Sequence, residues 1–248
     1  MIQIKNLQKR FGSQEVLRGV NLEIPEGQIT AVIGRSGTGK SVLLKHIIGL
    51  LKPDAGTVTV NGDDITKADG HRLNELRKKF GMLFQNAALL DSMSVYDNVA
   101  FPLREKTKLK EAEIRERVEK GLANVGIVGM NHKFPAELSG GMKKRVGLAR
   151  ALVTQPEIIL FDEPTTGLDP IMKKAIHQLI FDTQRQFGFT AIMVSHDIPE
   201  VFDFVDRVAM LFDGVIHETG TPEEMKQSEN AAVRQFLNGD LDGPIQIN

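Results

Sequence analysis

The sequence predicts an α/β protein that is built on a buried, mainly parallel sheet. Short apolar, β-branched runs alternate along the chain with helical patterns. A glycine-rich segment, GRSGTGKS at 34–41, stands between one such run and a helical pattern. Apolar residues make up 41% of the 248 residues and charged residues 25%, which is typical of a folded globular chain.

The apolar runs predict the strands of the core sheet. They are ITAVIG at 29–34, GMLFQ at 81–85, EIILFDE at 157–163 and TAIMVSH at 190–196. Two further segments alternate between apolar and polar residues and predict antiparallel strands. These are TVTVNG at 57–62 and VAMLFDGVIHETG at 208–220, which turns at Asp213-Gly214. We therefore expect a second, antiparallel sheet.

Strand signals are absent between Gln85 and Leu152, which predicts a helical subdomain of about 87–150 inserted into the α/β core. Within it, 104–125 predicts one helix with an apolar stripe and a solvated charged face. The stripe consists of Ile114, Val118, Leu122 and Val125. The charged face offers the i,i+4 pairs Glu111/Arg115, Glu113/Arg117 and Glu116/Lys120. One domain, 1–237, and a C-terminal tail, 238–248, complete the expected organisation.

Charge and composition exclude several classes of function. The formal net charge of −1 gives no overall cationic field, so we expect no nucleic-acid partner. The absence of cysteine excludes disulfides, thiol nucleophiles and cysteine-ligated zinc. The most apolar window, VLLKHIIGLL at 42–51, falls short of the roughly 20 residues that span a bilayer, and the start lacks the apolar centre of a secretory signal. We expect that the chain does not cross a membrane by itself.

The segment at 34–41 fits the pattern G-x-x-x-x-G-K-[ST] and has the strand and helix that this pattern requires on either side. Successive backbone N–H groups wrap a phosphate chain only where side chains do not block it. Lys40 is expected to reach the β- and γ-phosphates, and Ser41 to offer a hydroxyl to Mg²⁺. The predicted nucleotide-binding residues of this loop are Gly34, Arg35, Ser36, Gly37, Thr38, Gly39, Lys40 and Ser41.

Two adjacent carboxylates end the run EIILFDE, at the edge of the sheet where ligands collect in α/β proteins. Asp162 suits a Mg²⁺ shell, and Glu163 is expected to face an attacking water as general base. By itself, a strand that ends in Asp-Glu is more typical of a surface turn. The preceding phosphate-binding pattern favours the catalytic interpretation.

Three further sites follow strands or begin a helix. Ser139 is predicted to cap a helix over 140–152, and with Gly140 and Gly141 it offers a second anion site, suited to a partner's nucleotide. The alternative is a capped helix without a ligand. Gln85 and His196 follow predicted strands and are expected beside the phosphates, although each residue type more often has a structural role at such a place.

The sequence resembles the ATP-binding-cassette (ABC) ATPases. The resemblance covers nearly the whole chain and rests on six signals in order: GRSGTGKS, Gln85, LSGGM, ILFDE, TGLD at 166–169 and His196. It implies a P-loop NTPase fold with a RecA-like core, an antiparallel β subdomain and an inserted α-helical subdomain. It also implies hydrolysis of ATP with Mg²⁺ as cofactor.

The resemblance also implies a head-to-tail homodimer of cassettes with two ATP molecules, each between the P-loop (34–41) of one copy and the signature segment (LSGGM, 138–142) of the other. Phe11 would stack on the adenine, although an ordinary core aromatic is the alternative, and Asp169 would cross the interface. The implied catalytic residues are Lys40, Gln85, Glu163 and His196. The implied metal ligands are Ser41, Gln85 and Asp162.

One position departs from the family pattern, because Met142 stands where most members have Gln. Hydrolysis should survive this change, since Ser139 and the two glycines supply the donors. The longer phrases LSGGMKKRVGLARAL, LFQNAALLDSMSVYDNVAFPL and DEPTTGLDP resemble the subgroup that serves MCE-type (mammalian cell entry) lipid transporters, including the Mla system.

This subgroup implies an ATPase at the cytoplasmic face of the inner membrane that drives phospholipid transport and so maintains outer-membrane lipid asymmetry. The implied partners are a membrane permease that docks on 86–101, an MCE-domain substrate-binding protein and a small sulfate-transporter-like regulatory subunit. The tail from about Asn238 is expected to brace the cassette dimer. Two alternatives stay open: an importer ATPase for amino acids or another small polar solute, and a soluble ABC ATPase that acts on nucleic acid.

Overall fold

The computed structural model describes residues 1–246. The chain divides into two compact units, each of which is treated separately below. The first unit consists of Met1–Arg77 together with the chain from Thr190 onward, and the second consists of Lys78–Phe189.

The first unit contains most of the strands. Its elements are β1 (Ile2–Phe11), β2 (Gln14–Ile24), β3 (Ile29–Ile33), α1 (Lys40–Ile47), β4 (Ala55–Val60), β5 (Asp63–Asp64), α2 (Gly70–Lys78, which ends at the boundary), β8 (Thr190–Val194), η2 (Glu200–Phe204), β9 (Arg207–Phe212), β10 (Val215–Gly220), α7 (Pro222–Lys226) and α8 (Ala231–Asn238).

The second unit is mainly helical. Its elements are β6 (Phe80–Leu83), α3 (Val95–Lys106), α4 (Glu111–Asn124), η1 (Pro135–Glu137), α5 (Gly140–Leu152), β7 (Ile158–Asp162) and α6 (Pro170–Phe187). All four runs predicted as core strands are confirmed, as β3, β6, β7 and β8, and the helix predicted over 140–152 is confirmed as α5.

The core strands of the first unit run in the order β10-β9-β3-β8, with β3 parallel to both neighbours. Every residue of β3 and β8 is buried, as expected for strands that are covered on both faces. The predicted turn at Asp213-Gly214 joins β9 to β10. However, β9 pairs with β3, so this hairpin belongs to the core sheet and not to the second sheet. The polar alternation that suggested otherwise belongs to β10, which is half exposed.

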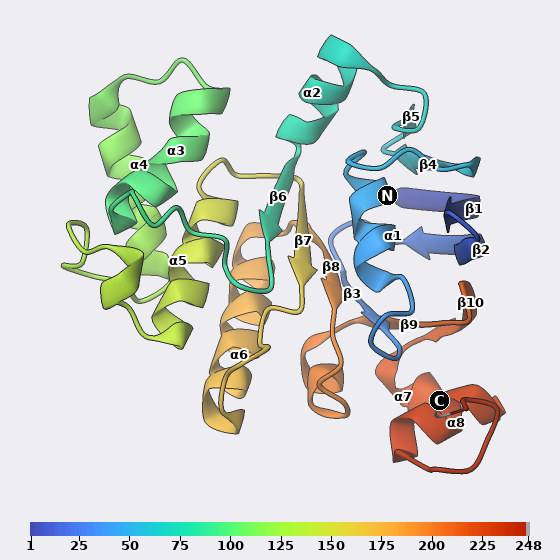
Figure 1. Ribbon diagram of the computed structural model, residues 1–248. Coiled ribbons are helices and arrows are strands. Elements are labelled where there is room, and N and C mark those ends of the chain that lie inside the picture. Colours follow the sequence, from blue (N-terminus) through green and yellow to red (C-terminus); the bar gives the residue numbers. More distant parts are fainter. Residues whose placement is uncertain (247–248) are drawn as a thin grey trace. The chain divides into compact units, whose positions relative to one another are not determined.

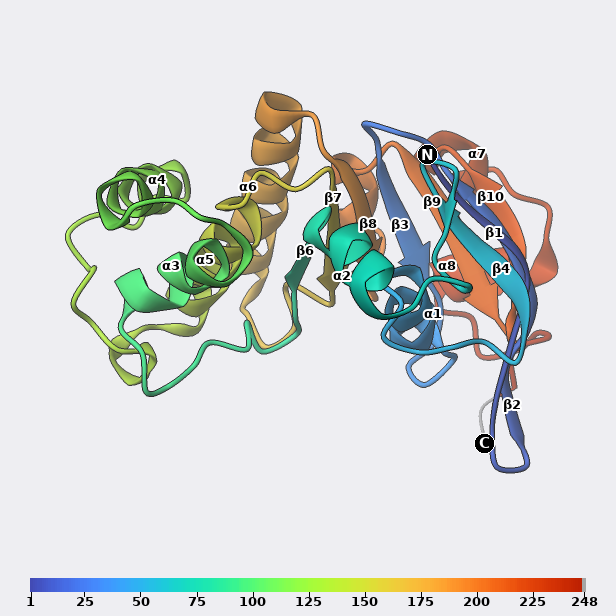
Figure 2. The same cartoon turned by 90° about the horizontal axis from the view of Figure 1, so that it is seen from above.

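The second sheet of this unit is antiparallel, in the order β2-β1-β4-β5. It confirms the strand predicted at 57–62, whereas β1 and β2 were not predicted. They were missed because bulges interrupt the alternation of apolar and polar residues along them. At one of these bulges Asn6 has a φ of 47°. Figure 2 shows β10 beside the antiparallel sheet, and the two sheets meet where the N–H of Arg18 donates to Gly214 O at 2.8 Å.

Helices α3, α4 and α5 pack together in the second unit (Figure 1). The helix α5 also packs close to β6, because Gly147 has no side chain. A Cβ on Gly147 would lie 2.7 Å from Leu83 and 3.1 Å from Ala87. The predicted helical subdomain, about 87–150, falls within this unit, and its boundaries stay a prediction.

The single helix predicted over 104–125 is wrong, because the chain forms two helices there, α3 and α4. The Thr107 hydroxyl donates to Leu103 O at 2.6 Å and ends α3. The Glu113 carboxylate accepts the N–H of Lys110 at 3.0 Å and so begins α4. The apolar stripe is confirmed, since its four members are buried. Glu111 pairs with Arg104 of α3 at 2.5 Å, a contact between helices that the i,i+4 pattern did not predict.

The predicted tail begins at the end of α8, and its last two residues lie outside the described part of the chain. Ile245 is only 5% exposed because Gln235 holds its backbone. The Gln235 amide donates to Ile245 O at 3.0 Å and accepts the N–H of Ile245 at 2.7 Å. Ile245 is therefore held against α8, whereas Leu241, earlier in the same segment, is 78% exposed. Within residues 1–246, no helix has the length and apolar character needed to span a membrane.

Candidate functional site

The glycine-rich loop joins β3 to α1 in a backbone path that glycine permits. Gly34, Gly37 and Gly39 have φ values of 146°, 79° and 99°, which side chains disfavour. A Cβ on Gly34 would lie 2.1 Å from Leu211 O, and one on Gly39 would lie 2.8 Å from Val16. Packing therefore requires Gly34 and Gly39, whereas at Gly37, where a Cβ would meet nothing within 4 Å, only the backbone conformation favours glycine. Without side chains at these three positions, a ligand can approach the loop backbone.

Lys40 begins α1 directly after this loop and is 4% exposed. Its ammonium donates to Gly34 O at 2.7 Å and to Arg35 O at 2.6 Å. The Thr38 hydroxyl donates to the same Arg35 carbonyl at 2.8 Å. The loop thus encircles a buried cation at the positive end of a helix, an arrangement suited to phosphate.

His196 lies at the same edge of the sheet as the loop. Val32 of β3 pairs with Val194 of β8, so Gly34 and His196 each stand two residues beyond a paired position. The backbone N–H of Ser195 also donates to Val32 O at 3.3 Å. The prediction that His196 lies near the phosphate loop therefore agrees with the strand register.

Phe11 ends β1 and is 46% exposed. This exposure rules out the alternative of an ordinary core aromatic. The ammonium of Lys9 lies 5.6 Å from the ring centroid. An exposed ring is suited to stacking on a base, which is the role that the resemblance implies.

The second unit carries the paired carboxylates at the end of β7. Asp162 is the last residue of the strand, and both carboxylates are half-buried. Glu163 has a φ of 49°, a left-handed conformation that is uncommon for a residue with a side chain. The Thr166 hydroxyl donates to Glu163 Oε2 at 3.0 Å and so orients this carboxylate.

Lys144 on α5 is a functional candidate that the sequence analysis did not identify. It is 5% exposed, its ammonium donates to Gln85 O, and Glu163 interacts with its charge. Burial lowers the pKa of Lys144. One side chain thus joins the predicted signature helix to Gln85 and Glu163. The sequence does not distinguish Lys144 from the neighbouring Lys143, because only the fold decides which of the two lysines is buried.

The signature segment forms an exposed helix N-terminus. The Ser139 hydroxyl accepts the N–H of Met142 at 3.3 Å, which confirms the predicted cap. Ser139 and Gly140 are exposed, whereas a Cβ on Gly141 would lie 2.3 Å from Met172. The arrangement offers unobstructed donors at the positive end of the 13-residue helix α5.

Asp169 caps α6 and is exposed. Its Oδ1 accepts the N–H groups of Ile171 and Met172 at 3.0 and 3.1 Å. The cap fixes the direction of the carboxylate without burying it. Its implied place at an interface with a second cassette stays a prediction.

The structure divides the predicted site residues between the two units. The first unit holds the phosphate loop, Phe11 and His196, and the second holds Gln85, Asp162, Glu163, Asp169 and the signature segment. Arg35 of the loop has a contact that sequence reasoning missed, since it donates to Gln246 O near the end of the described chain.

The ABC transporter family model matches residues 17–166. The chain is 48% identical over 247 residues to a probable ribonucleotide transport ATP-binding protein, mkl, of Mycobacterium leprae, and it covers 71% of that protein. It is 43% identical over 247 residues to the intermembrane phospholipid transport system ATP-binding protein MlaF of Haemophilus influenzae, covering 94% of it. The corresponding protein of Escherichia coli K12 is 39% identical over 245 residues and is covered to 91%.

Solved structures of ATP-binding cassettes have the same fold. The dimeric cassette MJ0796 in a post-hydrolysis state with ADP and Pi matches with a TM-score of 0.82 and 33% identity, over 90% of this chain and 99% of that one. CbiO1 of Clostridium perfringens, part of the transporter complex cbiONQ, matches with a TM-score of 0.84 and 33% identity, over 97% of this chain and 95% of that one. The loop geometry, the family model and relatives that match along the whole of this chain agree, and the chain belongs to the ABC transporter family.

Proposed function

We propose that this chain is the ATP-hydrolysing subunit of an ABC transporter that moves phospholipid between membranes. The observation that carries the proposal is the 43% identity along the full chain to a protein named for intermembrane phospholipid transport. The phosphate loop and the carboxylates at the end of β7 supply the chemistry that an ATPase needs. The chain would work at the cytoplasmic face of the inner membrane with a permease and an MCE-domain protein.

The phosphate loop would bind and orient the ATP. Its open N–H groups would receive the β-phosphate, and Lys40 would exchange its two carbonyl partners for phosphate oxygens. Phe11 would stack on the adenine and His196 would hold the γ-phosphate. Because the lysine is already confined in the loop, little side-chain entropy would be lost on binding.

Glu163 would act as general base in hydrolysis. Its carboxylate would take a proton from the attacking water as the water oxygen bonds to the γ-phosphorus in line with the leaving group. The bond to the β,γ-bridging oxygen breaks, and its electron pair stays with ADP. The Thr166 hydroxyl donates to one carboxylate oxygen and would hold the carboxylate toward the water.

The donor set fits Mg²⁺. Ser41, Gln85 and Asp162 offer hydroxyl, amide and carboxylate oxygens, which this hard cation prefers, and nucleotide phosphates usually complete its shell. When bound, Mg²⁺ neutralises negative charge on the β- and γ-phosphates. In the part of the chain that the structure describes, no group of three or more His, Asp or Glu side chains forms a metal site.

The exposed signature segment would act on the nucleotide of a second cassette. Ser139 and the first N–H groups of α5 would donate to its γ-phosphate, so ATP would hold two copies of the chain together. Hydrolysis removes the bridging charge and would allow reopening. This cycle would drive the permease, docked on 86–101, and the tail would brace the dimer.

A second candidate function is import of a small polar solute. The observation that favours it is the name of the 48% identical relatives, which refers to ribonucleotide transport. Both candidates use the same ATPase chemistry. The difference lies in the permease and the substrate-binding protein with which the chain assembles.

Co-purification from native membranes tests the two candidates. The chain would be tagged and extracted in mild detergent, and the bound subunits and lipids would be identified by mass spectrometry. A tagged, unrelated ABC cassette from the same cells is the control. Recovery of a permease, an MCE-domain protein and enriched phospholipid is expected. A solute-import permease without lipid enrichment would overturn the proposal in favour of import, and a soluble chain with nucleic acid would overturn both.

A further inference from the structure

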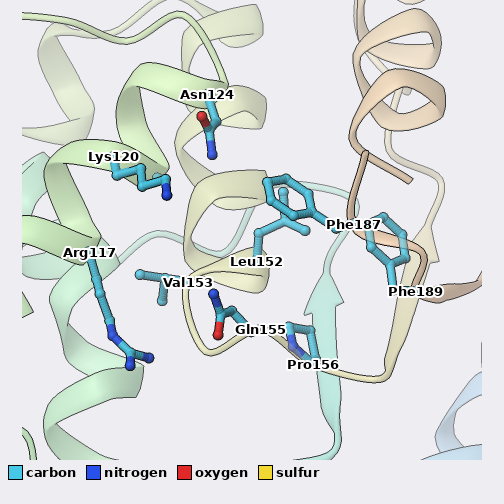
Figure 3. Close-up of a pocket in the computed structure, with 10 residues that line it drawn as sticks. Arg117, Lys120, Asn124, Leu152, Val153, Gln155, Pro156, Phe187 and Phe189 are labelled. Atoms are coloured by element: carbon cyan, nitrogen blue, oxygen red, sulfur yellow. The ribbon is translucent and has the colours of Figure 1, made fainter. Parts of the chain in front are cut away.

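The second unit contains a cavity of about 260 Å³ that has no part in the nucleotide chemistry described above. It lies where the C-terminal parts of α4, α5 and α6 meet the chain that leads into β7 (Figure 3). Its volume is just below the range of roughly 300–1,000 Å³ that is usual for small-molecule sites. The space therefore suits a ring system or a short acyl chain rather than a two-chain lipid.

The inner wall of this cavity is apolar. It consists of Leu152, Val153, Pro156, Phe187 and Phe189. Figure 3 shows the two phenylalanine rings at one side of the cavity and the aliphatic side chains beside them. Phe187 is 43% exposed, so a ligand that covered its ring would remove apolar surface from water.

Polar side chains with no partner surround this wall. Arg117 and Lys120 lie one turn apart on α4, and Asn124 follows one turn later. Within residues 1–246, none of these three side chains has an ion pair or a hydrogen bond. The carboxylate expected to pair with Arg117, that of Glu113, instead accepts the N–H of Lys110. Two exposed cations without an ion pair thus stand beside an apolar wall.

We propose that this cavity binds small amphiphilic anions, with the apolar part against the phenylalanine rings and the acidic group at Arg117 and Lys120. The ligand would also touch Leu152, the last residue of the helix whose first turn carries the signature segment. The proposal does not depend on the transported substrate.

The test uses 8-anilinonaphthalene-1-sulfonate, an aromatic anion whose fluorescence rises in apolar surroundings. The full chain would be titrated in the presence of Mg²⁺ and ADP, which fill the nucleotide site. The chain contains no tryptophan that would disturb the signal. Octanoate would serve as an anionic competitor, and octyl glucoside as its uncharged counterpart. We expect saturable binding that octanoate reverses and octyl glucoside leaves unchanged.

Gly121 allows the site to be filled without harm to the helix. A Cβ there would have only Val153, at 3.9 Å, as a neighbour. Gly121→Leu should fill the cavity and abolish binding. Gly121→Ala is the matched control: it improves the same helix position by about 1 kcal/mol, leaves most of the cavity open and should keep the affinity.

A charge pair tests the recognition of the anion. Arg117→Ala/Lys120→Ala should weaken binding roughly tenfold, because both cations contact the acidic group. Lys108→Ala/Lys174→Ala removes two exposed cations of the same unit outside the cavity and should have no effect. Circular dichroism would confirm that every variant is folded.

Three results would overturn the proposal. One is the absence of saturable binding by the wild-type chain. Another is equal affinity in the wild type and Gly121→Leu, which would place the probe elsewhere. The third is a failure of charge recognition, which either of two measurements can reveal. Octyl glucoside and octanoate would displace the probe equally, or both charge variants would lose the same affinity.

Discussion

Glu163 owes its position to a backbone conformation that a strand does not allow. In a regular strand, Asp162 and Glu163 would point to opposite faces. The φ of 49° at Glu163 ends this alternation, and Thr166 then holds the carboxylate. Strained backbone conformations cluster at active sites, ligand clamps and switch regions. The local sequence, Asp-Glu-Pro, identifies the two carboxylates but does not predict the left-handed backbone conformation of Glu163.

Glu163→Gln should lower the ATPase rate by a factor of about 10² to 10⁴, because the amide cannot accept the proton from water. ATP binding should be retained, since the change keeps the shape of the side chain. The rate would be followed by phosphate release and the affinity by equilibrium binding of ATP. Thr154→Val, at a position outside the proposed site, is the control. Hydrolysis by Glu163→Gln at the wild-type rate would remove this residue from the role of base.

His46 should make the stability of the fold depend on pH. It is buried on α1, its Nδ1 lies 2.8 Å from Val42 O, and burial lowers its pKa below the ordinary value of 6.5. As the pH falls through 6.5, the unfolded chain takes up a proton that the folded chain resists. The unfolding free energy should therefore decrease, with a slope of at most about 1.4 kcal/mol per pH unit from this group.

Urea unfolding at pH values on either side of 6.5 measures this effect. His46→Leu, which cannot take up a proton, should show a loss of stability on acidification that is about 1 kcal/mol smaller than in the wild type. His71→Gln is the control, because that side chain is exposed. The same pH dependence in all three proteins would contradict the assignment to His46.

Among the elements, α3 depends on one buried amide. The Asn98 side chain donates to Leu90 O, Met93 O and Ser94 O, each at 3.0 Å, and accepts the N–H of Leu90 at 2.7 Å. The loop before α3 has no strand or helix of its own. Asn98 therefore shapes the segment on which we expect a permease to dock.

Asn98→Ala should lower the unfolding free energy by about 2 to 4 kcal/mol, because buried backbone groups lose their partners. It should also reduce the amount of permease that co-purifies. Chemical denaturation and the membrane purification described above measure the two effects. Asn86→Ala, at an exposed position of the same segment, should change neither by much. A stability loss in Asn98→Ala no larger than in Asn86→Ala would show that the amide does not organise the loop.

The whole molecule is expected to act as an ATP-dependent pair. We expect the signature segment of one copy to offer its helix N-terminus to the nucleotide of a second copy. Glu163→Gln should preserve the closed pair, because ATP is not hydrolysed. The first unit and the second unit each carry part of the predicted site. If the signature segment of each copy faces the phosphate loop of the other, two copies complete two sites.

Ser139→Asp in the Glu163→Gln background should abolish this pairing. Aspartate caps a helix as well as serine does, so the N–H of Met142 keeps its acceptor and the fold is retained. The added carboxylate would repel the γ-phosphate. Light scattering after gel filtration with ATP should show a dimer for Glu163→Gln and a monomer for the double variant.

Thr221→Asp is the control for the capping change, since Thr221 caps α7 in the same manner by accepting the N–H of Glu224 at 3.2 Å. It should leave the ATP-dependent dimer intact. An unchanged dimer in the Ser139→Asp double variant would mean that the signature segment does not receive phosphate.

The sequence by itself determined the features that local physics controls. The phosphate loop, the buried parallel strands, the helix cap at Ser139 and the turn at Asp213-Gly214 each follow from glycine, β-branching and turn chemistry within about ten residues. The ordered motifs also sufficed to identify the family. These features need no knowledge of which distant segments meet.

Tertiary structure decided the rest, because packing and burial depend on residues far apart in sequence. It placed β9 beside β3, broke the helical pattern between α3 and α4, and exposed Phe11. It buried Lys144 against Gln85 O while leaving the neighbouring lysine half exposed. It also formed the cavity at the ends of α4, α5 and α6, since the free energy of each of these contacts arises only when the segments come together.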